Sequence, residues 1–274
     1  PRQRRHGIRG RVPGIGMDDK VIVWGGGVYN WFDPLTLVRA VGGLSRRHPD
    51  VRLYFMGLKH PNPGVPDMRI AWETQQLSEE LGLTGAHVFF NTGWVPYAER
   101  ADVLLDADIG VSTHFEHVET AFSFRTRILD YLWAGLPVVA TVGDSFGDCL
   151  DAEGLGRGVP PEDVDALERA LEEMLYDEAA AAAARERVRA FAERFRWRSV
   201  LAPLLEFCAR PARAQDLALT GGAAGSSGLR SRAYPRPRPS AGRDLALVVE
   251  YMRAGGPREV LRRARGRVRR VLAR

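Results

Sequence analysis

The chain has 274 residues, 45% of them apolar, and a formal net charge of +5, which suits a globular protein of one large domain with appendages. No run of about eighteen apolar residues is present, which excludes a membrane-spanning helix. The basic residues 1–16 lack the apolar stretch of a secretory signal, so we expect a cytoplasmic protein whose cysteines, Cys149 and Cys208, are free thiols.

Charge is unevenly distributed along the chain. Residues 209–274 carry 16 Arg against 4 Asp and Glu, which leaves 23 Lys and Arg against 30 Asp and Glu in residues 1–208. Residues 209–243, rich in Pro, Gly, Ser and Arg, predict a flexible linker, and residues 244–274 predict a basic amphipathic helical tail. This tail would either attach peripherally to the inner face of a membrane or remain solvated. Its few aromatic residues argue against nucleic-acid binding.

Short apolar runs alternate with segments of helical spacing between residues 20 and 208. The predicted strands are Lys20–Trp24, Val51–Gly57, His87–Phe90, Asp108–Ser112, Pro137–Thr141 and Gly156–Val159. The predicted helices are Pro34–Arg46, Ile70–Leu81, Tyr97–Leu105, one that contains Asp130, a short one through Cys149, Pro161–Leu175, Glu178–Phe195 and Trp197–Cys208. This alternation predicts an α/β fold in which a doubly wound parallel sheet carries helices on both faces, after a lead-in of residues 1–19.

In such sheets ligands bind outside the carboxyl ends of the strands, and the unusual residues of this chain follow predicted strands. The loop Gly25–Asn30 could bring backbone N–H groups and a helix N-terminus to a phosphate, or it could be a tight turn. It is neither a Gly-x-Gly-x-x-Gly loop nor a Walker loop. Asn91-Thr92-Gly93-Trp94 follows the third strand, and Gly143-Asp144 follows the fifth.

Residues 114–127, after the fourth strand, combine histidines, carboxylates and two arginines. Arg125 and Arg127 suit a diphosphate, because a guanidinium donates paired charge-assisted hydrogen bonds; alternatively, Arg127 pairs with Asp130 within the helix. Asp130 lies among apolar residues, where ribose hydroxyls would satisfy its carboxylate. Glu119 would bind sugar hydroxyls or stay solvated. The two histidines lack a third ligand at a recognisable spacing, so no metal is expected.

The end of this segment resembles the donor-site motif of group 1 (GT4-like) glycosyltransferases, retaining enzymes of the GT-B architecture, in the run Asp130-Tyr131-Leu132-Trp133-Ala134-Gly135-Leu136-Pro137-Val138-Val139. The resemblance covers roughly residues 21–208 and implies the nucleotide-sugar-binding, Rossmann-like half of a GT-B fold. It implies a ribose contact for Asp130 and a sugar contact for Glu119, which stands three residues before the position of the family's glutamate. The family's basic pair beside the glycine loop is absent, so Arg125 and Arg127 would hold the diphosphate.

The function implied is transfer of a hexose from a nucleoside diphosphate sugar to an unknown hydroxyl acceptor, with no cofactor. The expected donor-binding residues are Gly26, Gly27, Asn30, Trp94 and Asp130, and the expected catalytic residues are Glu119, Arg125 and Arg127. One alternative is a non-catalytic nucleotide-binding or scaffold fragment. Another is a dinucleotide-dependent oxidoreductase, but Gly57-Leu58-Lys59 supplies no acidic residue after the second strand. Because the first strand begins at Lys20, we expect the acceptor site on an N-terminal GT-B domain or a partner chain.

Overall fold

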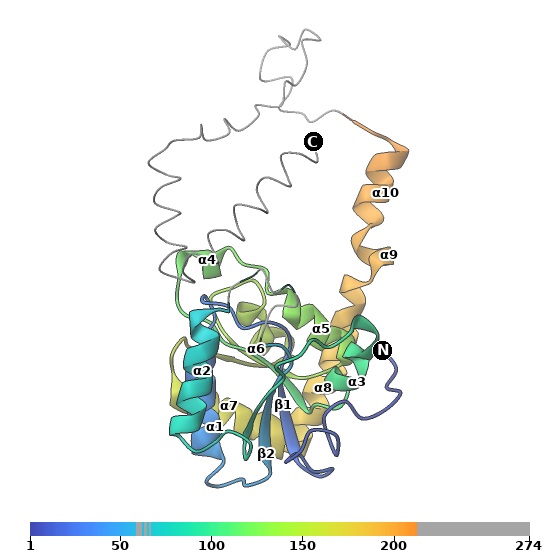
Figure 1. Cartoon of the computed structure of the whole chain (residues 1–274). Coiled ribbons are helices and arrows are strands. Elements are labelled where there is room, and N and C mark those ends of the chain that lie inside the picture. The colour runs from blue at the N-terminus through green and yellow to red at the C-terminus, as the bar shows by residue number, and fades with distance from the viewer. Residues whose placement is uncertain (59–61, 63–64, 66, 213–274) are drawn as a thin grey trace, which may run out of the picture. The chain divides into compact units, whose positions relative to one another are not determined.

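The computed structural model describes residues 1–58, 62, 65 and 67–212 (Figure 1). Within this part, Pro1–Ala209 form one compact unit. The basic helices predicted for residues 244–274, and nearly all of the linker predicted for residues 209–243, lie outside the described residues. No helix of the described part is long and apolar enough to cross a membrane.

The described residues form a sheet of six parallel strands. They are β1 Lys20–Trp24, β2 Val51–Phe55, β3 Val88–Phe90, β4 Ile109–Ser112, β5 Val138–Thr141 and β6 Gly156–Val159. Their order is β3-β2-β1-β4-β5-β6, so the chain winds outward from β1 and then returns to the centre to start again at β4. The predicted doubly wound sheet is confirmed, and its order reverses between β1 and β4.

Most of the predicted helices are present, and several are broken into shorter pieces. The helices are α1 Pro34–Leu44, α2 Arg69–Glu80, α3 Arg100–Leu104, α4 Val118–Ala121, α5 Thr126–Ala134, α6 Leu150–Glu153, α7 Val164–Tyr176, α8 Glu178–Ala192, α9 Trp197–Val200 and α10 Ala202–Ala209. The 3-10 turns are η1 Tyr97–Glu99, η2 Gly147–Cys149 and η3 Glu193–Phe195. The prediction of one closing helix over Trp197–Cys208 was wrong: it is divided at Leu201, because Pro203 has no N–H to donate to the preceding turn.

A separate apolar core lies on each face of the sheet. Helices α1, α2 and α7 cover one face, while α3, α5 and α8 cover the other (Figure 1). Successive residues of β1 alternate between the two, with Trp24 in the first core and Val23 in the second. Because both faces are covered, the strands are continuous apolar runs in the sequence, as is typical of parallel sheets.

The lead-in, residues 1–19, packs against the second face. Ile8 and Ile15 are buried in its core. The carboxylate of Asp106, just before β4, accepts hydrogen bonds from the backbone N–H groups of Ile8 and Arg9, both at 2.7 Å. These residues therefore belong structurally to the domain, and their role as a connection to a preceding domain remains a prediction.

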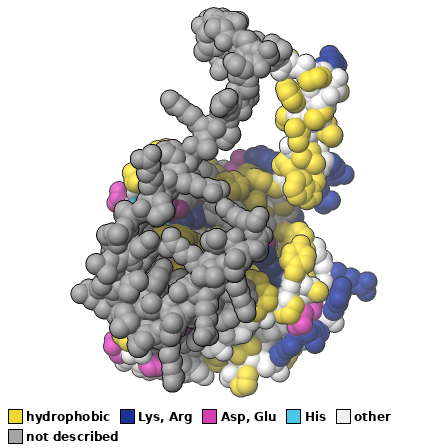
Figure 2. Space-filling model, turned by 45° about the horizontal axis from the view of Figure 1, so that its top comes forward, with side chains coloured by type: hydrophobic (Ala, Val, Ile, Leu, Met, Phe, Trp, Pro, Cys, Tyr) yellow, Lys and Arg dark blue, Asp and Glu magenta, His cyan; other side chains and the backbone are white. Residues whose placement is uncertain are grey.

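The surface of α9 and α10 is unusually apolar. Figure 2 shows hydrophobic side chains along these helices, and the described residues leave Trp197 77% exposed and Leu205 63% exposed. No residue of α10 is buried by the described part of the chain. These helices therefore add little apolar burial to the domain itself.

Candidate functional site

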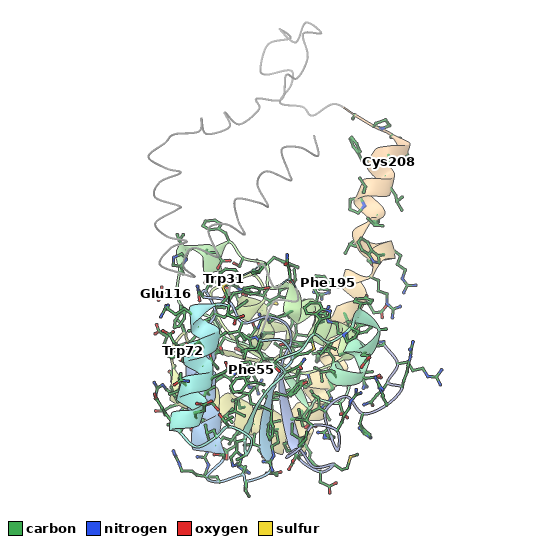
Figure 3. The ribbon with its side chains drawn as sticks, viewed as in Figure 1. Trp31, Phe55, Trp72, Glu116, Phe195 and Cys208 are labelled. Carbon is green, nitrogen blue, oxygen red and sulfur yellow. The ribbon has the colours of Figure 1, made fainter. Side chains whose placement is uncertain are left out.

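The loops that follow β1 and β4 meet at the centre of the carboxyl edge. The backbone N–H of Asp33 donates to the carbonyl of Thr113 at 3.0 Å, and Phe32 forms an isolated bridge with His114. Figure 3 shows Trp31 and Glu116 at this end of the molecule. Because the chain leaves β1 and β4 toward opposite sides, this is the place where open α/β sheets form a binding crevice.

The glycine loop after β1 is both a tight turn and a cavity wall. A Cβ atom on Gly25 would stand 2.9 Å from the ring of Tyr131, whose hydroxyl accepts a hydrogen bond from Gly25 N at 2.8 Å. Gly26 has a φ angle of 109°, which favours glycine. Gly26 and Gly27 line a cavity of about 200 Å³. The loop is thus a tight turn and also borders a cavity, so the turn and the phosphate-binding interpretations are compatible.

The other two residues expected beside this loop have different surroundings. Trp94 lines the same cavity, and its side chain is largely exposed. Asn30 does not line it; its Oδ1 atom accepts a hydrogen bond from Ile70 N at 3.1 Å. Asn30 therefore satisfies one of the free N–H groups in the first turn of α2.

Arg127 is buried behind the glycine loop, with 8% of its surface exposed. Its Nη2 atom donates to the carbonyl of Gly27 at 2.9 Å, and its guanidinium lies over the rings of Phe32 and Trp24, at 3.9 and 4.3 Å from their centroids. Burial lowers the pKa of Arg127 to about 10, so the side chain stays charged at neutral pH. The alternative pair with Asp130 is not formed.

Arg125 is also buried and connects two carboxylates. Its Nη2 atom lies 3.1 Å from Glu119 Oε2, and its Nε atom lies 3.4 Å from Asp144 Oδ2. Glu119 is more exposed and also accepts a hydrogen bond from the hydroxyl of Ser123 at 2.6 Å. That bond, together with Arg125, lowers the pKa of Glu119. The structure therefore brings Glu119 and Arg125 together, as one unit of the loop.

Asp144 anchors this unit from the loop after β5. Its Oδ1 atom accepts hydrogen bonds from the N–H groups of Phe146 and Gly147, at 2.9 and 2.7 Å, and its Oδ2 atom lies 3.5 Å from His114 Nε2. Burial alone would raise the pKa of Asp144, but His114 and the two N–H groups outweigh it and lower that pKa below its ordinary value. Asp144 is thus charged and fixed next to Arg125.

Asp130 forms an ion pair that the sequence did not predict. Its carboxylate accepts a hydrogen bond from the guanidinium of Arg100, at the start of α3. Arg100 lines the cavity beside the glycine loop and also the wider groove along α5 in which Asp130 lies. Burial lowers the pKa of Arg100. The carboxylate expected to bind ribose is therefore already oriented by a cation from the same crevice.

Sequence reasoning missed Arg100, Asp144 and Tyr131 as parts of this site. Arg100 stands in an ordinary polar stretch, with no local signal. Asp144 was noted only as a loop residue after a strand, and Tyr131 only as part of the family-like motif. The hydroxyl of Tyr131 donates to the carbonyl of Val111 at 2.8 Å and accepts from Gly25 N, so it joins β4 to the glycine loop.

Unsatisfied polar atoms gather in this region. Within the described part of the chain, the buried side-chain atoms without a hydrogen-bond partner are Asp33 Oδ2, Arg100 Nε, Ser112 Oγ, His114 Nε2, Arg125 Nε and Arg127 Nη1. Buried polar groups are normally paired, so a cluster of exceptions needs an explanation such as a ligand or ordered water. No group of three or more His, Cys, Asp or Glu among the described residues is placed to hold a metal ion.

An all-parallel sheet whose order reverses between β1 and β4, with a glycine loop at that reversal, defines a doubly wound, Rossmann-like α/β domain. The family model of the glycosyl transferases group 1 matches residues 19–177. The chain belongs to this family, and its fold is the Rossmann-like half of the GT-B architecture.

Individual relatives agree with this assignment. A phosphatidyl-myo-inositol mannosyltransferase of Mycolicibacterium smegmatis is 27% identical over 169 residues, which are 62% of this chain and 39% of the relative. The Anabaena protein Alr3699/HepE, solved with UDP and glucose, superposes with a TM-score of 0.58 at 18% identity, over 70% of this chain and 48% of that one. The C-terminal domain of the group 1 protein LpcC from Francisella tularensis superposes with a TM-score of 0.53 at 16% identity, over 64% of this chain and 84% of that one. The chain thus spans less than half of the curated relative.

Proposed function

We propose that this domain is the donor-binding half of a retaining glycosyltransferase, which transfers a hexose from a nucleoside diphosphate sugar to a hydroxyl acceptor. The observation that carries the proposal is the pair of buried arginines beside a glycine loop at the sheet's reversal point, in a chain of this family. Solved structures of Alr3699/HepE with UDP and with UDP-glucose support a nucleotide sugar as the ligand. No cofactor or metal is needed for this reaction.

The proposed roles follow from charge and position. The N–H groups of the loop at Gly26 and Gly27, with Arg125 and Arg127, stabilise the negative charge that develops on the leaving diphosphate. Asp130 accepts hydrogen bonds from the ribose hydroxyls. Glu119, next to Arg125, accepts hydrogen bonds from the sugar.

The test of donor binding is a calorimetric titration of the full chain with UDP, GDP and dTDP. We expect one of them to bind with a dissociation constant below about 1 mM, the range of a weak specific ligand. Binding should weaken in Arg125→Met and remain unchanged in Glu116→Gln, which alters an exposed carboxylate of the same loop. If none of the three binds at millimolar concentration, the site assignment is wrong.

The acceptor site and the membrane contact are separate proposals. We infer that the acceptor binds on an N-terminal GT-B domain or a partner chain, and that the basic residues 244–274 attach the protein peripherally to the inner face of a membrane. Sedimentation with anionic liposomes, with and without residues 244–274, tests the second; equal partitioning contradicts it. A non-catalytic scaffold is the alternative function, and sugar transfer or hydrolysis of a bound UDP-sugar by the chain contradicts that alternative.

A further inference from the structure

The charge of Arg127 has no acidic counterpart in the described structure. No carboxylate oxygen of the described residues lies within 4.0 Å of its guanidinium, although the side chain is buried. Two aromatic faces and one carbonyl surround it instead. The nearby cation Arg125 shares the ring of Phe32, with its guanidinium carbon 5.2 Å from the centroid. Arg125 is paired with Glu119 and Asp144, so the charge of Arg127 is the one left uncompensated. A buried cation without a partner is costly, and an anion bound in the cavity would offset that cost.

The carbonyl of Gly27 is held by two donors. Arg127 Nη2 donates to it at 2.9 Å and Trp24 Nε1 at 3.2 Å. Trp24 belongs to β1 and Arg127 to the first turn of α5, so the glycine loop is fixed to two central elements of the domain. Both lone pairs of this carbonyl are then occupied.

A fixed carbonyl also fixes the next N–H group. The peptide bonds of the described chain are trans, and in a planar trans peptide the C=O and N–H bonds point in opposite directions. With the Gly27 carbonyl turned toward Arg127 and Trp24, the N–H of Val28 is directed away from them. Val28 lines the cavity, and its N–H meets no acceptor among the described residues.

We propose that Arg127 is a positioning residue for the phosphate-bearing ligand: through Gly27 it orients the Val28 N–H into the cavity, and its unpaired charge makes the glycine loop selective for anions. This inference rests on the proposed donor function and changes the role of Arg127 within it. Arg127 acts mainly through the loop and through its charge, whereas the charge of Arg125 is already paired with Glu119 and Asp144.

The test uses the full chain and compares ligands that differ in phosphate. Dissociation constants for UDP, inorganic pyrophosphate and uridine are measured by calorimetry, with ligand-observed NMR for uridine; GDP and guanosine take their place if the chain selects GDP. In Arg127→Met, UDP should bind about tenfold to a hundredfold more weakly, the loss expected for one charge-assisted interaction. Uridine, which has no phosphate, should change by less than about twofold in the dissociation constant.

Two further variants separate charge from orientation. Arg127→Lys retains the cation and should recover part of the UDP affinity. Trp24→Phe keeps an aromatic face for Arg127 but removes the second donor to the Gly27 carbonyl. It should therefore also weaken UDP binding, by a smaller factor than Arg127→Met does. The indole N–H signal of Trp24 in a ¹H–¹⁵N spectrum, assigned by its loss in Trp24→Phe, should shift in Arg127→Met because both groups donate to one carbonyl.

The outcomes are distinct. If wild-type protein binds none of the nucleoside diphosphates, the proposed function fails. If it binds UDP and Arg127→Met binds UDP equally well, or loses UDP and uridine by the same factor, the positioning role is overturned. Should Arg127→Met not fold, Arg127→Lys and Trp24→Phe carry the same comparison of UDP with uridine, and unchanged UDP binding in both overturns the proposal.

Discussion

Asp130 is the residue whose role can be isolated most directly by choice of ligand. Its carboxylate is oriented by Arg100 and is proposed to bind ribose hydroxyls, which nucleosides and nucleotides share. Asp130→Asn should therefore raise the dissociation constants of uridine and UDP by similar factors, about tenfold for the loss of a hydrogen bond to a charged group. Arg125→Met should weaken only UDP. Ligand-observed NMR and calorimetry give both constants, and an Asp130→Asn protein that loses UDP alone would contradict the ribose role.

Substitutions at Asp144 test how much its hydrogen bonds and its ion pair with Arg125 stabilise the domain. Asp144→Ala removes the acceptor for two buried N–H groups and the charge facing Arg125, so the free energy of unfolding should fall by about 2–4 kcal/mol. Asp144→Asn keeps the Oδ1 acceptor and loses only the charge, and should cost less. Urea denaturation at pH 7 measures both. A loss in Asp144→Asn equal to that in Asp144→Ala would mean that the Oδ1 acceptor adds nothing, whereas an unchanged stability of Asp144→Asn would mean that the charge contributes nothing.

The same residue predicts a pH dependence. The pKa of Asp144 is lower in the folded protein than its ordinary value of about 3.9. Its charged form therefore contributes stability that is complete above the unfolded-state pKa and is lost as pH falls through the folded-state pKa. Wild-type stability should decrease over this acid range more steeply than that of Asp144→Asn. Parallel curves from urea denaturation between pH 7 and acid pH would refute this assignment.

At the scale of the elements, sequence patterns predicted the strands well and the helices around the site less well. Most strands are short apolar runs, such as Val138–Thr141 and Val88–Phe90, and their positions depend on their own residues. The sequence predicted one helix, containing Asp130, in the segment after β4, whereas the structure has two: α4 ends at Ala121 and α5 begins only at Thr126. The break contains Arg125, which is buried and contacts Asp144 and Phe32 of other loops, and such distant contacts leave no local signal in the sequence.

Contacts between distant elements explain what could not be predicted at the site. Arg100 and Asp130 are 30 residues apart, and Arg127 and Gly27 are 100 apart. Periodicity and spacing give no information about such pairs. By contrast, Gly26, Gly27, Arg125 and Asp144 could be located at the carboxyl edge from sequence, because the parallel topology alone brings these loops together.

The packing of the lead-in, residues 1–19, against the domain can be tested through Asp106. Asp106 accepts hydrogen bonds from the buried N–H of Ile8 and the partly buried N–H of Arg9, and its loss would leave both without this partner. Asp106→Ala should lower the free energy of unfolding by about 2–4 kcal/mol and expose the lead-in to trypsin at its arginines. The matched control is Glu99→Gln, which removes an exposed ion pair with Arg5 and should cost less than about 1 kcal/mol. Equal trypsin resistance of Asp106→Ala and wild type would contradict the packed lead-in.

Within residues 1–58, 62, 65 and 67–212, the apolar side chains divide between the buried cores and the exposed surface of α10. Leu171 of α7 is fully buried in the first core, whereas Leu204 and Leu205 of α10 are 54% and 63% exposed. Large buried side chains lose both burial energy and packing when truncated, while exposed ones lose little. Leu171→Ala should therefore lower the free energy of unfolding by about 2–5 kcal/mol.

The same measurement on α10 should give a much smaller value. The double variant Leu204→Ser and Leu205→Ser should change the free energy of unfolding by less than about 0.5 kcal/mol, because the described part of the domain buries neither side chain. Urea denaturation of the full chain at several protein concentrations compares the two variants under identical conditions. A loss from the α10 variant as large as that from Leu171→Ala would contradict the view that α10 contributes little to the stability of this domain. If that loss grew with protein concentration, the apolar surface would be shown to bury itself between copies of the chain.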